Sequence, residues 1–126
     1  MFIKIRKNKA AFTIVEIMII VAIIAVLAAI AVPLFVKARK QSHGRRILND
    51  ARAMDAAINQ WVLEKGKKDG DTVNTTEAAT YLKTAWKSTD VLGNAFTVGT
   101  VGATQITISA TTKTALAGVG VDWGAY

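Results

Sequence analysis

A long apolar segment, Phe12 to Val36, dominates the N-terminal third of the chain, and its 25 residues include one ionisable side chain, Glu16. As a helix, a segment of this length reaches about 37 Å, more than the ~30 Å hydrocarbon thickness of a bilayer. The sequence therefore predicts a membrane-spanning helix over residues 12–36. An ionised carboxylate inside such a span is costly unless a cation meets it, which makes Glu16 a candidate functional residue.

A short basic segment precedes the span. Residues 1–11 contain no acid and four basic side chains: Lys4, Arg6, Lys7 and Lys9. They end in two small residues, Ala10 and Ala11, followed by Phe-Thr-Ile-Val-Glu. This pattern resembles the N-terminal signal of type IV pilins and type II secretion pseudopilins, in which a basic leader precedes Phe-Thr-x-x-Glu. The resemblance implies that a prepilin peptidase cuts between Ala11 and Phe12 and that Phe12 is then N-methylated.

Two further positions agree with the resemblance, and one departs from it. After the implied cut, Glu16 becomes the fifth residue and Pro33 the twenty-second, and the family's subunits favour these residues at these places. The family normally has Gly immediately before the cut, where this chain has Ala11. Because the peptidase needs a small residue there, Ala11 is expected to be a weaker substrate than Gly.

The physical role of Glu16 follows from the amine that cleavage would create on Phe12. That cation would lie about 6 Å along the helix from Glu16 of its own chain. We expect the carboxylate to point away from the helix end, which disfavours pairing within one chain. A neighbouring copy shifted along the axis could present its Phe12 amine to Glu16 in a low-dielectric setting and so fix the register between subunits. In the alternative, Glu16 simply lies near the lipid headgroups, protonated or snorkelling.

Length and composition limit the number of domains and the kinds of site that the chain can contain. After the span there is room for one small domain, residues 37–126. The net charge of +7 includes the leader, which holds four of the 16 Lys and Arg residues and none of the nine acids, so the mature chain would carry +3. This balance gives no strong indication of nucleic-acid binding. The chain has no cysteine, which excludes disulfides and thiolate metal sites.

Beyond the span, the helical pattern continues to about Lys65, where Gly66 is a candidate C-cap residue. Its apolar side chains recur at helical spacing and predict an amphipathic face: Ile47, Ala51, Met54, Ile58, Trp61 and Val62. Pro33 predicts a kink or local unwinding near residues 29–33. The unwinding is either a tolerated feature of a transmembrane helix or, as in the family's filaments, a segment that melts on assembly.

The C-terminal half predicts a short helix followed by strands. Thr75 or Thr76 would cap a helix over residues 77–87, and strands are expected over 95–98, 104–110 and 113–121. Apolar side chains of these strands could pack on the amphipathic helix: Phe96, Val98, Ile106 and Ile108. The expected fold is α+β and pilin-like, with a long N-terminal helix packed on a small antiparallel sheet.

A turn is expected at residues 90–96, which resemble a degraded form of a turn found in many pseudopilins. Asp90 would cap it, and Gly93 and Asn94 would tolerate positive φ. Major pseudopilins can bind calcium through a C-terminal loop. We do not expect this site here, because the acids near the C-terminus are few. His43 is the sole histidine and is expected to be solvated rather than a metal ligand. Trp123 and Tyr126 fit either an exposed contact tip or core packing.

No nucleophile, acid-base pair or phosphate loop is visible, so we expect a non-enzymatic protein without cofactors. The first hypothesis is a filament subunit, inserted in the bacterial inner membrane with its C-terminal domain outside the cytoplasm. Its partners would be further copies, prepilin peptidase, an inner-membrane platform protein, an assembly ATPase and membrane lipid. The second is a secreted protein cut after Ala31, since Ala29-Ile30-Ala31 resembles a signal-peptidase site. The third is a DNA-uptake pilin that binds nucleic acid through its basic surface.

Overall fold

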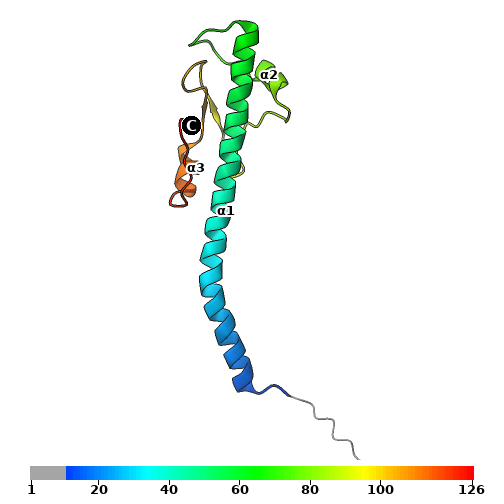
Figure 1. Cartoon of the computed structure of the whole chain (residues 1–126), viewed down its shortest axis with the longest axis vertical. Helices are drawn as coiled ribbons and strands as arrows, with labels where there is room; N and C mark the ends of the chain where they lie inside the picture. The colour runs from blue at the N-terminus through cyan, green and yellow to red at the C-terminus, as the bar shows by residue number, and fades with distance from the viewer. Residues whose placement is uncertain (1–10) are drawn as a thin grey trace, which may run out of the picture. The chain divides into compact units, whose positions relative to one another are not determined.

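The computed structural model describes residues 11–126, so the expected leader lies outside the described residues except for Ala11. The dominant element is helix α1, Ile14–Lys65 (Figure 1). The contacts within the chain divide it into two units, one ending at Val36 and the other running from Lys37 to Tyr126. The fold is α+β and pilin-like, as the sequence predicts.

Helix α1 ends where the sequence predicts. Gly66 has a positive φ of 62°, a conformation that glycine adopts without steric cost. The Lys67 backbone N–H donates to the Val62 carbonyl at 3.1 Å, which is the closing hydrogen bond of a Schellman motif. The glycine therefore stops the helix by satisfying one of its last free carbonyl groups.

Of the kink or local unwinding predicted near Pro33, the unwinding does not occur in the single chain, because α1 continues through residues 29–33 without interruption. Proline removes one helical hydrogen bond, whereas the remaining turns on both sides keep theirs. Helix propagation is cooperative, so these flanking turns hold the segment in place.

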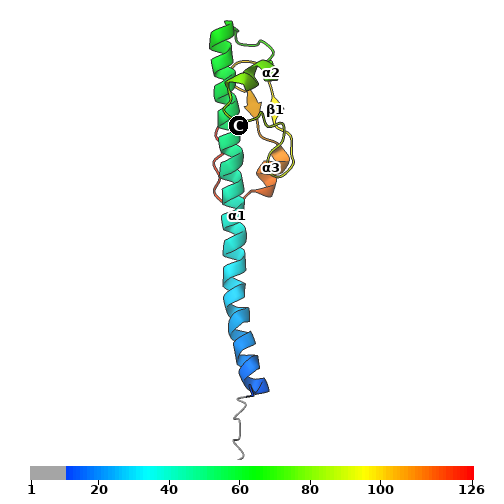
Figure 2. The ribbon, with the colours of Figure 1, turned by 90° about the vertical axis from the view of Figure 1, so that its right-hand side faces the viewer.

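The second unit is built on the predicted amphipathic face of α1. Five of its six side chains are buried, and the sixth, Val62, packs against them half-buried. From the C-terminal half, Phe96, Ile106 and Ile108 are buried in the same cluster, and Val98 packs against it. Figure 2 shows α2, β1 and α3 along one side of this part of α1. The apolar pattern of the sequence thus identified the core of this unit.

The helix after α1 is shorter than predicted. It consists of α2, Thr75–Ala78, and a 3-10 turn η1, Ala79–Tyr81. The cap is Asn74 rather than a threonine, and its Oδ1 accepts the backbone N–H groups of Thr76 and Glu77. The chain becomes extended at Leu82, so the helical conformation ends there instead of reaching Lys87.

Two of the three predicted strands form, and the third is wrong. Strands β1, Thr97–Val98, and β2, Ile106–Thr107, pair antiparallel with Thr97 opposite Thr107. Helix α3, Ala110–Ala115, takes up the first three residues of the predicted third strand, and residues 116–121 form turns and irregular structure. Ser109 caps this helix by accepting the Thr111 N–H, which supplies a local hydrogen bond that an extended chain would lack.

Asp90 closes the turn at residues 90–94 as predicted, and its side chain also contacts α3. Asp90 Oδ1 accepts the backbone N–H groups of Leu92 and Asn94 at 2.9 and 3.0 Å. Its Oδ2 accepts a short hydrogen bond from the hydroxyl of Thr112 on α3, and both side chains are buried. Gly93 has the expected positive φ, whereas Asn94 does not. This buried carboxylate therefore joins the turn to α3.

The C-terminal segment is held by hydrogen bonds to α1 and by core packing. The Gln41 side-chain amide donates to the Val119 carbonyl at 2.8 Å, and the Tyr126 hydroxyl donates to Asp55 at 3.1 Å. Burial, followed by the charge of Asp55, raises the pKa of Tyr126, so its phenol remains a donor at neutral pH. Trp123 and Tyr126 pack against the core, which decides between the two expectations for them.

The C-terminal segment packs closely against α1 at Gly44. A Cβ there would lie 2.6 Å from one methyl of Val121 and 3.2 Å from the other. We expect Gly44→Ala to lower the unfolding free energy by about 1 kcal/mol, because overpacking outweighs the better helix propensity of Ala. Denaturant unfolding of the full chain in detergent, followed by Trp fluorescence, measures this change.

The matched control is the same substitution in a Val121→Ala background, which removes the two obstructing methyl groups. There Gly44→Ala is expected to become neutral or stabilising. An equal loss of stability in both backgrounds would show that the contact with Val121 is not the cause.

Candidate assembly segment

The first unit presents an apolar surface that the chain itself does not cover. Within α1, the most apolar 18-residue window has a mean hydropathy of 3.2, and none of it is buried. All side chains from Ile14 to Val36 are exposed. By length and composition this part of α1 is able to cross a membrane. Burying this much apolar surface requires lipid or other protein chains.

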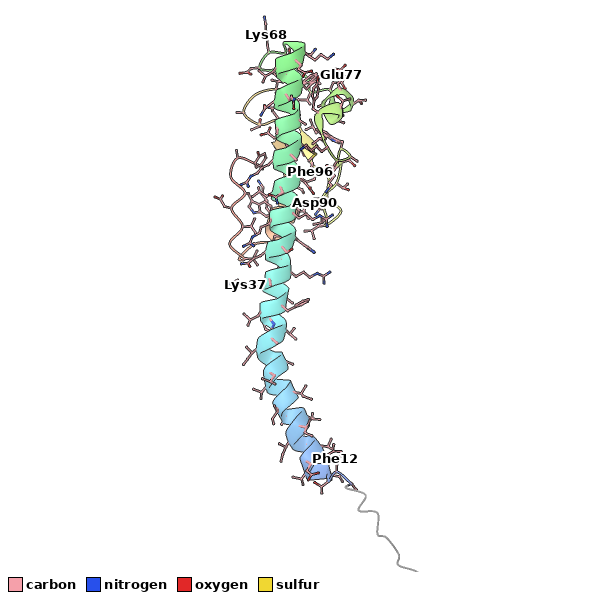
Figure 3. The ribbon with its side chains drawn as sticks, turned by 45° about the vertical axis from the view of Figure 1, so that its right-hand side comes forward. Phe12, Lys37, Lys68, Glu77, Asp90 and Phe96 are labelled. Atoms are coloured by element: carbon pink, nitrogen blue, oxygen red, sulfur yellow. The ribbon has the colours of Figure 1, made fainter. Side chains whose placement is uncertain are left out.

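The bond between Ala11 and Phe12 lies before the helix. Both residues are exposed and outside regular secondary structure, and the side chain of Phe12 is 76% exposed (Figure 3). A peptidase binds its substrate as an extended segment, so a non-helical, exposed bond suits cleavage. This geometry is compatible with processing at the position that the sequence predicts.

Glu16 folds back onto the start of α1. Its Oε2 accepts the Thr13 backbone N–H at 3.0 Å, while the Thr13 hydroxyl accepts the Glu16 N–H at 3.2 Å. This reciprocal pair is a capping box, and it satisfies two of the four free N–H groups at a helix start. The sequence expectation that the carboxylate points away from the helix end is therefore wrong, because the cap draws it toward that end.

Within the described residues, 11–126, no cation forms a salt bridge with Glu16. Within residues 11–126 the one salt bridge joins Lys87 to Asp50, in the other unit. A carboxylate has two oxygens and about four lone-pair directions, and the cap occupies one of them. Glu16 is consequently a hydrogen-bond acceptor with free capacity in an apolar surface.

Pro33 lies inside the same exposed apolar surface of α1. Its backbone has no N–H, so the Ala29 carbonyl lacks its usual donor four residues later. That is the one place within the predicted span where the helix ladder loses a bond through residue type.

The remaining candidates do not form a site. His43 is half-buried on α1, and residues 11–126 contain no group of three or more His, Cys, Asp or Glu side chains that could hold a metal. Trp61 is buried and donates its indole N–H to Glu77 at 2.7 Å, which is a core role. The basic side chains after the span, from Lys37 to Arg46, lie mostly exposed on α1.

Two structural features were not predicted from the sequence: the capping role of Thr13 and the close contact at Gly44. Thr13 acts as the cap partner of Glu16, and the Thr-x-x-Glu spacing was a signal that could have identified it. The close approach at Gly44 depends on a residue 77 positions away, Val121, so no local pattern could have predicted it.

Comparison with known proteins agrees with this geometry. Residues 6–32 match the family model of the prokaryotic N-terminal methylation motif. The chain carries a type IV prepilin N-terminus. It is also 35% identical over 89 residues to the type IV major fimbrial protein FimA of Dichelobacter nodosus. That similarity covers 71% of this chain and 50% of FimA, so the chain spans about half the length of this relative. No solved structure matches the chain.

This prepilin N-terminus coincides with the structural features that distinguish the first unit. The matched residues include the exposed Ala11–Phe12 bond, the Glu16 capping box and most of the apolar surface. The matched segment is also the part of α1 that is long and apolar enough to cross a membrane.

Proposed function

We propose that the chain is the precursor of a filament subunit, cut between Ala11 and Phe12, methylated on Phe12 and polymerised through α1. The observation that carries the proposal is a single carboxylate, Glu16, at the start of a bare apolar helix inside a methylation motif. In this proposal residues 1–11 are the leader, 12–36 the membrane and assembly helix, and 37–126 the globular domain. The amphipathic part of α1, residues 37–65, belongs to that domain.

Cleavage would create an α-amine on Phe12, and methylation would leave its positive charge in place. The Phe12 amine of a neighbouring copy would donate hydrogen bonds to the carboxylate oxygens of Glu16, which can accept them while the hydrogen bond from the Thr13 N–H stays intact. The apolar surfaces of adjacent α1 helices would bury one another and exclude water, which strengthens the charge pair. Glu16 thus sets the register, and the apolar residues supply most of the association energy.

Pro33 would contribute to assembly by a different route. The turn of α1 that contains Pro33 already lacks one hydrogen bond. Unwinding this turn when neighbouring helices pack would therefore cost less free energy than unwinding another turn of the helix. The melting of residues 29–33 on assembly is therefore part of the proposal, although the single chain is helical there.

The partners in this proposal follow from the resemblance to type IV pilins. Prepilin peptidase, acting also as N-methyltransferase, would process the chain, and a platform protein with an assembly ATPase would extract it from the inner membrane. Until then lipid would cover α1, with the globular domain outside the cytoplasm. The similarity to a type IV major fimbrial protein favours a pilus over a secretion pseudopilus.

No observation favours the two alternative functions. Cleavage after Ala31 would release a soluble chain and discard the Glu16 cap together with most of the methylation motif. Nucleic-acid binding would rest on the basic side chains after the span, and the charge of the mature chain is +3.

The intact mass of the chain after coexpression with prepilin peptidase tests the proposal. We expect a chain that begins at Phe12 and carries one additional methyl group. The matched control is Ala11→Leu, whose larger side chain is expected to block cleavage and leave Met1 in place. A wild-type product that retains Met1, or that begins at Val32, would contradict the proposal.

A further inference from the structure

Three basic residues follow the apolar segment directly, and we refer to Lys37, Arg39 and Lys40 as the basic collar. Lys37 and Arg39 are exposed, and Lys40 is half-exposed. None of the three forms a salt bridge, since the one salt bridge of the described residues belongs to Lys87 and Asp50. The collar is therefore a group of unpaired cations at the start of the second unit.

Position along α1 determines where the collar lies in a membrane. The four residues from Lys37 to Lys40 span about 6 Å of helix, starting immediately after Val36. The headgroup layer of each leaflet is roughly 5–8 Å thick, which is half the difference between the thickness of the whole bilayer and that of its hydrocarbon core. At 100° per residue, the three side chains also point in different directions around the helix. They would contact headgroups on several sides of it.

We propose that the basic collar binds the phosphate groups of anionic phospholipids and fixes the depth of the subunit in the membrane before assembly. This inference rests on the membrane insertion in the proposed function. Lys and Arg close to a membrane surface attract anionic lipids, and long basic side chains near a helix end reach the headgroups readily. Extraction of the subunit into a filament would require these contacts to break.

Within residues 11–126 no acid forms a salt bridge with the collar, and the acid nearest to it in the fold is Asp122, which lines a shallow hollow beside Gln41 and Arg45. The nearest acids along α1 are Asp50 and Asp55, and both are engaged, by Lys87 at 2.9 Å and by the Tyr126 hydroxyl at 3.1 Å. Asp122 is a single carboxylate that already accepts the Gly124 N–H, whereas the phosphates of an anionic membrane surface are numerous enough to pair with all three cations of the collar.

The test uses the full chain in nanodiscs that contain a mixture of phosphatidylglycerol and phosphatidylcholine. Spin-labelled versions of the two lipids report by electron paramagnetic resonance which of them associates with the protein. We expect the wild type to prefer phosphatidylglycerol by about 5-fold at low salt, and the preference to disappear near 1 M salt. The triple variant K37Q, R39Q, K40Q is expected to show no preference.

A matched control removes the same charge elsewhere in the second unit. Lys65, Lys68 and Lys83 are exposed, and Lys68 lies at the opposite end of that unit's part of α1 from Lys37 (Figure 3). The variant K65Q, K68Q, K83Q should keep the wild-type preference. If it loses the preference as well, net charge rather than the collar is responsible and the inference fails.

The remaining outcomes separate this inference from the proposed function. A wild-type chain that enters nanodiscs but shows no lipid preference, or a collar variant that keeps it, overturns the inference alone. Reduced filament yield of the collar variant with unchanged lipid preference would show that the collar binds acids of a second copy instead. A chain that does not enter nanodiscs overturns both the inference and the membrane insertion.

Discussion

Replacing Glu16 with Gln is expected to reduce filament yield by at least ~30-fold while leaving membrane insertion unchanged. Gln preserves the capping box, because an amide oxygen at this position also accepts the Thr13 N–H. It removes the charge that would meet the Phe12 amine of the next copy. Leaving one partner of a buried charge pair alone costs about 2–5 kcal/mol, and the polymer repeats this cost in every subunit. Sheared filaments and membrane fractions, quantified by immunoblot, give the two readouts.

The matched control separates the cap of Glu16 from its charge. Thr13→Val removes the hydroxyl that accepts the Glu16 N–H, which weakens the helix start by about 1 kcal/mol and leaves the carboxylate in place. This variant is expected to form filaments at close to the wild-type level. If Thr13→Val abolished filaments and Glu16→Gln did not, the cap rather than the charge would be the feature on which assembly depends.

Replacing Asp90 with Ala is expected to destabilise the globular domain by about 3 kcal/mol, because buried donors lose their acceptor. The hydroxyl of Thr112, which is 0% exposed, would lose the acceptor of its proton, and the part-buried N–H groups of Leu92 and Asn94 would lose theirs. A change of this size lowers the Tm of a small domain by more than about 10 °C. Thermal unfolding of the full chain in detergent, followed by near-UV circular dichroism, measures the shift.

Asp122 provides the control for Asp90, since it is also an acid that caps a local turn. It is exposed and accepts one backbone N–H, that of Gly124, at 2.9 Å. Asp122→Ala is expected to change the unfolding free energy by no more than about 0.5 kcal/mol. Similar losses in the two variants would show that burial of the Asp90 network adds no stability of its own.

The parts of the fold that follow from local pattern could be predicted from the sequence. The apolar residues from Ile47 to Trp61 recur at helical spacing, and Gly66 is a strong stop signal, so the C-terminal part of α1 and its buried face were confirmed. Periodicity reports which face of an element is apolar, and burial follows that face. The side chains of Ile106 and Ile108 were identified as core residues for the same reason.

Where two local signals competed, the sequence was misleading. Residues 113–121 alternate sufficiently to suggest a strand, yet the capping hydroxyl of Ser109 starts α3 just before them. Asn74 caps α2 in place of Thr75 or Thr76, because its side-chain oxygen accepts two backbone N–H groups. Short elements depend on single hydrogen bonds, and a propensity pattern does not reveal which of several polar residues will form them.

The contacts between distant segments could not be predicted at all. The hydrogen bond from Thr112 to Asp90 and the packing of Val121 on Gly44 join residues that are far apart in the sequence. Glu16 has two roles that differ in this respect. Its role in the cap could be predicted, because the Thr-x-x-Glu spacing is the signature of a capping box. Its proposed pairing with another copy involves two chains and cannot be read from the sequence of one. Its assembly role therefore requires a measurement on the filament.

Solid-state NMR on mixed-label filaments measures the pairing of Glu16 with Phe12 directly. One half of the subunits would carry ¹⁵N-Phe and the other half ¹³C-Glu, so a transfer signal arises only between copies. The Phe12 amine is distinct in shift from the amides of the other phenylalanines, and Glu64 and Glu77 lie in the second unit. We expect a signal from this amine to the Glu16 carboxyl carbon, about 3.5 Å away in a charge-assisted hydrogen bond. A signal that is absent here, but present when doubly labelled chains are diluted in unlabelled ones, would place the pair within one chain and contradict the proposed assembly.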